Sequence, residues 1–346
     1  MYDAFLLLGF GGPEGPDEVM PFLRNVTHGR AVPDERLAEV AEHYLRFGGV
    51  SPINAQCRAL LDAVGAEFER RQIDLRMYWG NRNWHPFVTD TVARMHADGV
   101  QRALVLATSA VGGYSGCRQY REDLASARAC VGIGAPELIK LRHFFNHPGF
   151  VTANADHLRA ALALVPEDER ESAALVFTAH SVPDVADADS GIEGRLYSRQ
   201  QREAARLVAE AVRGPGAAFD LAWQSRSGSP GTPWLEPDVN DHLAELAKRG
   251  VRSVAVCPTG FVSDHLEVLW DLDIEAATTA RELGLMMVRA GTAGTHASFV
   301  DAVVGLVREQ LNGTDPAVVG TLGVTGVDCP TERGCCVSRA SASRRR

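Results

Sequence analysis

Three carboxylates recur every four residues in the second half of the chain, at Glu267, Asp271 and Glu275. On an α-helix, four residues advance about 400° and rise about 6 Å, so these side chains form an acidic ladder along one face. Carboxylate oxygens are the ligands of hard divalent cations, and such a ladder can conduct one. A solvated acidic face is the simpler interpretation. Val268, Leu269, Trp270 and Leu272 between the carboxylates are apolar, and the ladder follows an apolar run at 254–257, which favours a buried site after a strand.

A second candidate is His180, which follows the apolar run 174–178. A single histidine is more often structural, but imidazole at the carboxyl end of a parallel strand can act as a base or a ligand. Ser181 is not in a Gly-x-Ser-x-Gly turn, which argues against a serine hydrolase. The glycine turn at residues 9–12 has Glu14 where a dinucleotide fingerprint needs its third small residue, so we do not expect a nucleotide cofactor.

Short apolar runs alternate with amphipathic segments along the chain, a pattern that predicts βαβ units with helices on both faces of parallel sheets. We expect eight strands, in two four-stranded halves, near residues 5–10, 75–79, 103–108, 138–141, 174–178, 221–224, 254–258 and 286–289. The segments 99–106 and 250–257 resemble each other, which suggests two similarly wound domains. We place the first domain at residues 1–148, the second at 149–311 and a tail at 312–346, with the last helix able to pack back on the first domain.

The composition is that of an ordinary globular protein of 346 residues with a formal charge of −9. An acidic chain lacks the basic footprint of a nucleic-acid-binding protein. No apolar stretch is long enough to span a membrane and the N-terminus has no basic signal region, so we expect a cytoplasmic protein. Seven cysteines without a signal peptide do not suggest disulfides.

Six segments together resemble the ferrochelatase family, of the single-chain bacterial type. They are LLGFGGPE at 7–14, GGVSPIN at 48–54, YWGNR at 78–82, FTAHS at 177–181, WQSR at 223–226 with PWL at 233–235, and FVSDHLE at 261–267. The resemblance implies an α/β fold of two Rossmann-like domains, each with a four-stranded parallel sheet, and a porphyrin cleft between them. It also implies insertion of ferrous iron into a porphyrin, which is a lyase reaction.

The resemblance assigns the family's catalytic pair to His180 and Glu267. Metal insertion removes two protons from pyrrole nitrogens, and either side chain can accept a proton or hold Fe²⁺. Asp271 and Glu275 match an acidic path behind that glutamate, along which iron would lose its water stepwise. Asp264 and His265 are expected to orient the pair.

A flat porphyrin edged with propionates needs apolar walls and a cationic or hydroxyl rim. By resemblance, the porphyrin contacts are Phe10, Trp223, Trp234 and Phe261 as walls, and Ser51, Tyr120, Arg46 and Arg30 as the rim. Each aromatic residue is equally well explained as ordinary core. A tyrosine that some Gram-positive members use as a metal ligand aligns near Glu14, so that contact is expected to be absent or replaced.

Three cysteines in the tail resemble the extension that supplies a [2Fe-2S] cluster in some ferrochelatases. They are Cys329, Cys335 and Cys336. Such a cluster needs four thiolates, and the fourth is expected from Cys117 in preference to Cys130. The adjacent pair departs from the spacing of the animal proteins. A zinc site or an unliganded tail is the alternative.

The domain order, the arginine-rich composition and the tail resemble actinobacterial members, whose substrate is coproporphyrin III and whose product, iron coproporphyrin III, leads to haem b. Protoporphyrin IX is the alternative substrate. A cobalt or nickel chelatase would usually present a second histidine ligand, and none is evident. A non-catalytic porphyrin carrier would have no use for the acidic ladder. Transient contact with neighbouring haem-pathway enzymes is expected.

Overall fold

The computed structural model describes residues 1–29, 32–227, 231–327 and 336. Predicted site residues Arg30, Cys329 and Cys335 therefore lie outside the described residues. The chain divides into two compact units. The first unit comprises Met1–Thr108, Tyr120–Leu141 and Ser263–Trp270, and the second comprises Ser109–Gln119, Arg142–Val262 and Asp271–Arg346. The predicted domain boundaries at residues 148 and 311 remain predictions.

The first unit is built on a four-stranded parallel sheet of order β2-β1-β3-β4. Its strands are β1 (Ala4–Gly9), β2 (Arg76–Asn81), β3 (Arg102–Ala107) and β4 (Glu137–Lys140). Every residue of the central strand β1 is buried. A strand covered on both faces must be apolar throughout, which explains why its sequence shows no alternation of polar and apolar residues.

Helices cover both faces of this sheet. The helical elements are η1 (Pro16–Glu18), α1 (Val19–Val26), α2 (Asp34–Arg46), α3 (Ile53–Arg70), α4 (Val88–Ala97), α5 (Gln119–Val131) and α11 (Leu266–Val268). Leu6 and Leu8 pack with residues of α4 and α5, whereas Phe5 meets Phe68 of α3 with ring centroids 5.5 Å apart. The alternation of β1 side chains thus divides the core into two layers.

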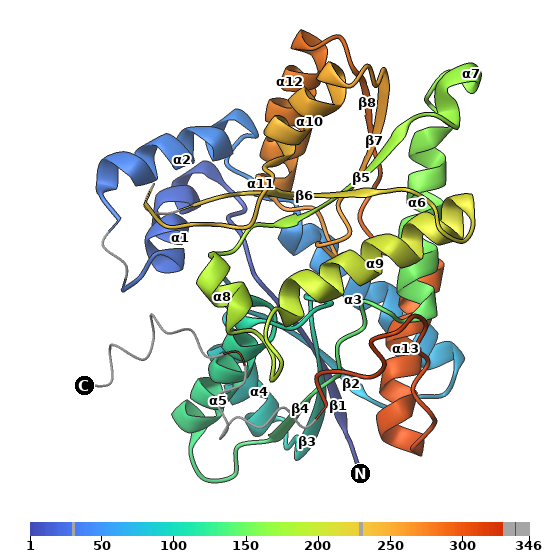
Figure 1. Cartoon of the computed structure of the whole chain (residues 1–346). Helices are drawn as coiled ribbons and strands as arrows, with labels where there is room; N and C mark the ends of the chain where they lie inside the picture. The colour runs from blue at the N-terminus through green and yellow to red at the C-terminus, as the bar shows by residue number, and fades with distance from the viewer. Residues whose placement is uncertain (30–31, 228–230, 328–335, 337–346) are drawn as a thin grey trace. The chain divides into compact units, whose positions relative to one another are not determined.

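The second unit repeats the same strand order, as β6-β5-β7-β8, again all parallel. Its strands are β5 (Ala174–His180), β6 (Asp220–Gln224), β7 (Ser253–Cys257) and β8 (Met286–Arg289). In Figure 1, α10 (Val239–Lys248) and α12 (Ala277–Glu282) cover one face of this sheet, and α6 (Pro148–Leu162) and α9 (Leu196–Arg213) cover the other. The predicted fold class, with two similarly wound sheets, is confirmed.

The remaining elements of the second unit carry several predicted site residues. They are the π-helix η2 (Tyr114–Arg118), α7 (Glu167–Arg170), α8 (Asp184–Ala188), the π-helix η3 (Leu269–Ala276) and α13 (Ala297–Asn312). Helix α13 packs on α6, where Phe150 and Phe299 meet with ring centroids 5.7 Å apart. No helix among the described residues is long and apolar enough to cross a membrane.

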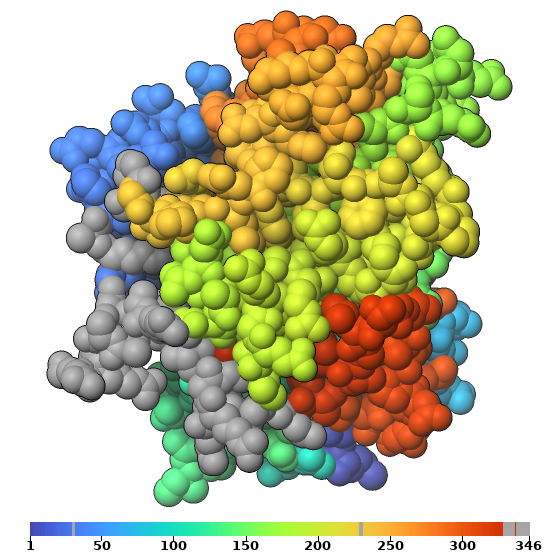
Figure 2. Space-filling model, viewed as in Figure 1, coloured from blue at the N-terminus to red at the C-terminus, as the bar shows by residue number. Residues whose placement is uncertain are grey.

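The segment after α13 follows the surface of α9, and we call residues 313–327 the strap. Figure 2 shows it in red against the yellow to green surface of the preceding helices. The backbone N–H of Thr321 donates to Oε1 of Glu203 at 2.7 Å, and Nε2 of Gln200 donates to Oγ1 of Thr325 at 2.8 Å. These bonds attach the strap to the first half of α9.

The acidic ladder differs from the prediction in its winding. The sequence predicts an α-helix, but residues Leu269–Ala276 form a π-helix, η3, which continues from α11. A π-helix closes its hydrogen bonds between residues i and i+5, so a turn contains more residues than the 3.6 of an α-helix. Four residues are then slightly less than one full turn, so the carboxylates of Asp271 and Glu275 are offset in the opposite sense to the one predicted.

Candidate active site

His180 is the last residue of β5, paired with Gln224 of β6. Its ring atom Nδ1 lies 2.5 Å from the backbone oxygen of Ser181. Burial lowers the pKa of His180, while the Ser181 carbonyl and the negative charge of Asp271 act in the opposite direction. The imidazole is therefore held neutral at neutral pH, and a neutral imidazole can accept a proton or bind a metal.

Asp271 is held at the same end of the second sheet. It is 9% exposed and accepts hydrogen bonds from Nε2 of Gln224, at 3.3 Å, and from Oγ of Ser225. Ser225 has a φ of 61°, which is uncommon for a residue other than glycine and directs the chain as it leaves β6. The structure thus brings together His180 and Asp271, two of the predicted site residues.

Glu267 belongs to the first unit, in the short helix α11. The helix begins at His265, whose Nδ1 accepts from the N–H of Val268 at 3.4 Å. The N–H of Asp264 donates to Oε1 of Gln56, a residue of α3, at 2.8 Å. Although part of the Glu267 side chain is exposed, the surrounding protein desolvates its carboxylate and raises the pKa to about 7. Glu267 can therefore exchange a proton near neutral pH.

Helix α2 packs against the same segment and carries the predicted residue Arg46 together with His43 and Tyr44, which the sequence did not single out. The rings of His43 and Trp270 are stacked, with centroids 3.8 Å apart and planes 9° apart. The guanidinium of Arg46 lies 5.2 Å from the Trp270 ring centroid. Burial and then the charge of Glu267 raise the pKa of Tyr44. These contacts join residues far apart in the sequence, so no local pattern indicated them.

The two end carboxylates of the ladder are exposed to solvent and the middle one is buried. Glu267 and Glu275 have exposed side chains, whereas Asp271 is buried. Its buried carboxylate is compensated by the hydrogen bonds from Gln224 and Ser225 described above, as a buried charge requires.

The predicted porphyrin contacts of the first unit are placed as follows. Ser51 and Tyr120 are buried, and Phe10 is partly buried beside Phe22. The guanidinium of Arg82 lies 4.6 Å from the Tyr120 ring centroid and forms an ion pair with Asp123. Sequence reasoning did not single out Arg82, although it lies in one of the matching segments.

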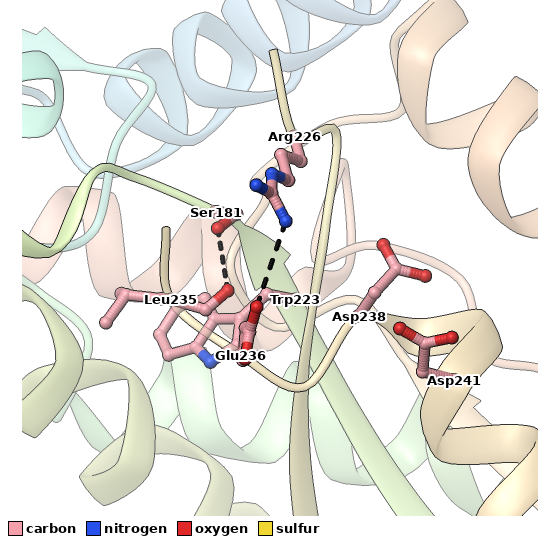
Figure 3. A pocket seen from close by; sticks show the side chains of 7 residues that line it. All are labelled: Ser181, Trp223, Arg226, Leu235, Glu236, Asp238 and Asp241. Carbon is pink, nitrogen blue, oxygen red and sulfur yellow. Dashed lines mark hydrogen bonds and ion pairs between the residues drawn. The ribbon is translucent and has the colours of Figure 1, made fainter. Parts of the chain in front are cut away.

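In the second unit, Trp223 and Phe261 are buried and Trp234 is partly buried. A pocket lies beside this group, lined by Ser181, Trp223, Arg226, Leu235, Glu236, Asp238 and Asp241. In Figure 3 the Ser181 hydroxyl points to the backbone oxygen of Leu235, 2.9 Å away, and Arg226 extends toward Glu236. The pocket is thus lined by an aromatic face and several charged groups.

Cys57, Cys117, Cys130 and Cys257 have free thiols. Cys117, in η2, and Cys336 are buried and belong to the second unit, whereas Cys130 is exposed on α5 of the first unit. The N–H of Gly191 donates to Sγ of Cys336 at 3.3 Å. Within the described ranges, no group of three or more His, Cys, Asp or Glu side chains could hold a metal ion. Because Cys329 and Cys335 lie outside those ranges, this does not test the predicted cluster.

The two parallel sheets with the same strand order define a chelatase-like α/β protein. SirB from Bacillus subtilis, solved with Fe³⁺, is similar with a TM-score of 0.54 at 12% identity, covering 90% of this chain and 97% of that one. A Deinococcus radiodurans protein described as structurally similar to chelatases has a TM-score of 0.52 at 13% identity, covering 91% of this chain and 56% of its own. At such low identity these structures support the fold alone.

The ferrochelatase family model matches residues 2–311, and the chain belongs to the ferrochelatase family. A coproporphyrin III ferrochelatase from Nocardia farcinica is 58% identical over 340 residues, covering 96% of each chain. The coproporphyrin III ferrochelatase from Streptomyces coelicolor is 52% identical, covering 98% of this chain and 94% of its own. The one from Mycolicibacterium smegmatis is 56% identical, covering 91% of this chain and 92% of its own.

Proposed function

We propose that this protein inserts Fe²⁺ into coproporphyrin III to give iron coproporphyrin III, in the biosynthesis of haem b. The assignment of coproporphyrin III as substrate rests on the high sequence identity, between 52% and 58% over nearly the whole chain, to relatives named for that activity. Iron is a substrate here.

His180 and Glu267 are the proposed catalytic pair. Metal insertion replaces two pyrrole N–H bonds by bonds to iron, so two protons must leave the ring. The neutral imidazole of His180 and the carboxylate of Glu267, with a pKa raised to about 7, are both able to take a proton or to bind the metal. Asp264 and His265 shape the start of the helix that carries Glu267, which supports the orienting role proposed for them.

Glu275, Asp271 and Glu267 are the proposed iron path, in that order. Exposed Glu275 would meet hydrated iron, and its carboxylate oxygens can replace water ligands. The spacing supports a stepwise transfer, because successive carboxylates are about one helical turn apart along the continuous segment of α11 and η3.

Arg46, Ser51, Tyr120 and Arg30 are the proposed propionate contacts, and Phe10, Trp223, Trp234 and Phe261 the proposed porphyrin walls. Arg46 supports this assignment because it makes no ion pair with any described residue, which leaves its charge for a carboxylate ligand. Coproporphyrin III has four propionates, so its binding should depend on such cations more strongly than that of protoporphyrin IX, which has two.

The test is anaerobic incubation of the purified protein with Fe²⁺ and either porphyrin, followed by the shift of the Soret band. We expect the wild type to metalate coproporphyrin III. His180→Ala and Glu267→Gln should each lower turnover at least a hundredfold, because each removes a group that acts on the reacting atoms. Both variants should unfold at the denaturant concentration of the wild type. A preference for protoporphyrin IX would contradict the proposal that coproporphyrin III is the substrate.

The alternative of another class is a porphyrin carrier. A carrier would bind coproporphyrin III, quench its fluorescence and leave it metal-free during the same incubation. That result, with either porphyrin, would remove the enzyme proposal and leave the carrier.

We further propose a [2Fe-2S] cluster held by Cys117, Cys329, Cys335 and Cys336. The described cysteines support this role, because Cys117 and Cys336 are buried and part of the same compact unit. The N–H donated to Cys336 Sγ is the kind of bond that tunes cluster sulfurs. Such a cluster would supply a one-electron redox couple.

The expected cytoplasmic location and contacts with haem-pathway enzymes also remain proposals.

A further inference from the structure

Tyr197, in the first turn of α9, makes a direct contact with the backbone of His180. Its hydroxyl donates to the carbonyl oxygen of His180 at 2.7 Å. The tyrosine is 6% exposed, so this hydrogen bond is shielded from water. Nothing in the sequence pattern around Tyr197 indicates this role.

The His180 carbonyl needs such a donor because of its position in the sheet. The pairing of β5 with β7 ends at Phe177 and Cys257, three residues before His180. Beyond that point β5 and β7 no longer pair, and a buried carbonyl oxygen needs a hydrogen-bond donor. The Tyr197 hydroxyl supplies the donor from α9.

Tyr197 and β6 together fix a single peptide unit. The carbonyl of His180 and the N–H of Ser181 belong to the same planar group. Tyr197 binds the carbonyl, and the N–H donates to the backbone oxygen of Gln224 at 2.7 Å. With both ends held, the peptide plane cannot rotate, and the backbone from which the imidazole projects is fixed.

Tyr197 is itself held rigidly. Its N–H donates to Oγ of Ser190 at 3.0 Å, and Ser190 is fully buried. Its ring lies against Trp223, with centroids 5.9 Å apart and planes at 31°. The hydroxyl is therefore directed by a helix start and an aromatic contact.

We propose that Tyr197 is a positioning residue, which holds the imidazole of His180 in the orientation that metal insertion requires. This inference rests on the proposed function of His180. Removal of the hydroxyl frees one of the two anchors of the peptide, so the imidazole samples other orientations. Misplacement of a catalytic group lowers turnover more than binding.

Tyr197→Phe removes the hydroxyl and keeps the ring. The matched control is Tyr78→Phe, because Tyr78 is also buried, at 4% exposure, and donates to Oδ2 of Asp98 at 2.7 Å in the first unit. We expect kcat of Tyr197→Phe to fall about tenfold relative to the control, with KM for coproporphyrin III within about twofold. A general loss of stability would affect both variants alike.

A second measurement does not depend on activity. In protein labelled with ¹⁵N-histidine, the ring signals of His180, assigned by their loss in His180→Ala, should shift or broaden in Tyr197→Phe and stay in place in Tyr78→Phe. Unchanged His180 signals, or a kcat within twofold of the control, would overturn the proposal.

The two proposals can fail separately. A wild-type protein that metalates neither porphyrin, with His180 signals that still move in Tyr197→Phe, removes the proposed function and keeps the positioning contact. If Tyr197→Phe does not fold, Ser190→Ala leaves the tyrosine in place but removes the acceptor of its N–H. It should lower kcat in the same sense by a smaller factor, and an unchanged kcat would overturn the proposal.

Discussion

One physical effect shifts the pKa values of the two proposed catalytic side chains in opposite directions. Burial disfavours a charged form, so it lowers the pKa of the imidazole of His180 and raises that of the carboxyl group of Glu267. In water the two pKa values would differ by about two units, with the carboxyl group the more acidic. In the protein this order is reversed, so at neutral pH the imidazole of His180 is neutral and the carboxyl group of Glu267, with a pKa of about 7, can exchange its proton.

The pH dependence of turnover should follow Glu267. Its pKa of about 7 means that the carboxylate form, which can accept a proton or bind Fe²⁺, is gained as the pH rises. The pKa of His180 is below its usual value, so its neutral form is already present in that range. We expect kcat/KM for coproporphyrin III, measured anaerobically from pH 5.5 to 8.5, to rise with a midpoint at about 7.

The matched comparison is Glu275→Gln, at the exposed end of the ladder. It should raise KM for Fe²⁺ and leave the midpoint unchanged. A flat profile in the wild type, or a midpoint that moves in Glu275→Gln, would show that Glu267 does not set the pH dependence.

At the scale of elements, the strands were predictable and the winding of η3 was not. Strands buried on both faces read as continuous apolar runs, and all eight lie within two residues of the predicted ranges. The spacing of Glu267, Asp271 and Glu275 is equally compatible with an α-helix and with a π-helix. The choice depends on packing, which a local pattern does not contain.

The same reasoning explains what was predicted of the site. His180 and Glu267 lie in matching segments next to strands, and strand ends mark sites in α/β proteins. Tyr44 and Gln56 approach the helix of Glu267 from distant parts of the chain, as Tyr197 approaches His180. Their roles arise from tertiary contacts, and the sequence around each is that of an ordinary helix.

The N-cap of helix α6 makes the free energy of unfolding depend on pH. His147 is its N-cap, with Nδ1 accepting from the N–H of Gly149 at 3.1 Å. Burial, followed by the charge of Arg142, lowers the pKa of His147 to about 4. Between about pH 6.5 and 4 the unfolded state binds more protons than the folded state, so the free energy of unfolding falls as the pH falls. At pH 5 the loss is about 2 kcal/mol.

Asparagine keeps a capping acceptor but does not titrate. His147→Asn should therefore lose about 2 kcal/mol less than the wild type between pH 7 and pH 5, measured by urea unfolding. His28→Asn, at an exposed histidine, should follow the wild type. Equal losses in His147→Asn and the wild type would contradict the prediction.

At the scale of the whole molecule, the two sheets share a strand order but the two units supply different chemistry. The first unit carries the acidic group Glu267, and the second carries the imidazole of His180 with Asp271. The second unit also continues into the strap, which ties α9 to the residues before α6. The N–H of Val319 donates to the carbonyl oxygen of Asn146 at 2.9 Å, and that of His143 donates to the carbonyl oxygen of Thr325 at 3.0 Å.

Two truncations separate the structural role of the strap from the proposed role of the tail cysteines. A chain ending at Val327 keeps the strap bonds and removes three of the four proposed cluster thiolates. We expect it to fold, with the visible absorption and iron content of the full-length protein lost, because four thiolates are required.

A chain ending at Asn312 also loses the bonds of Thr321 and Thr325 to α9. At about 1 kcal/mol for each hydrogen bond lost, its free energy of unfolding should fall by a few kcal/mol more. Iron-dependent colour in the chain ending at Val327 would contradict the cluster assignment, and equal urea midpoints for the two truncations would show that the strap does not stabilise the second unit.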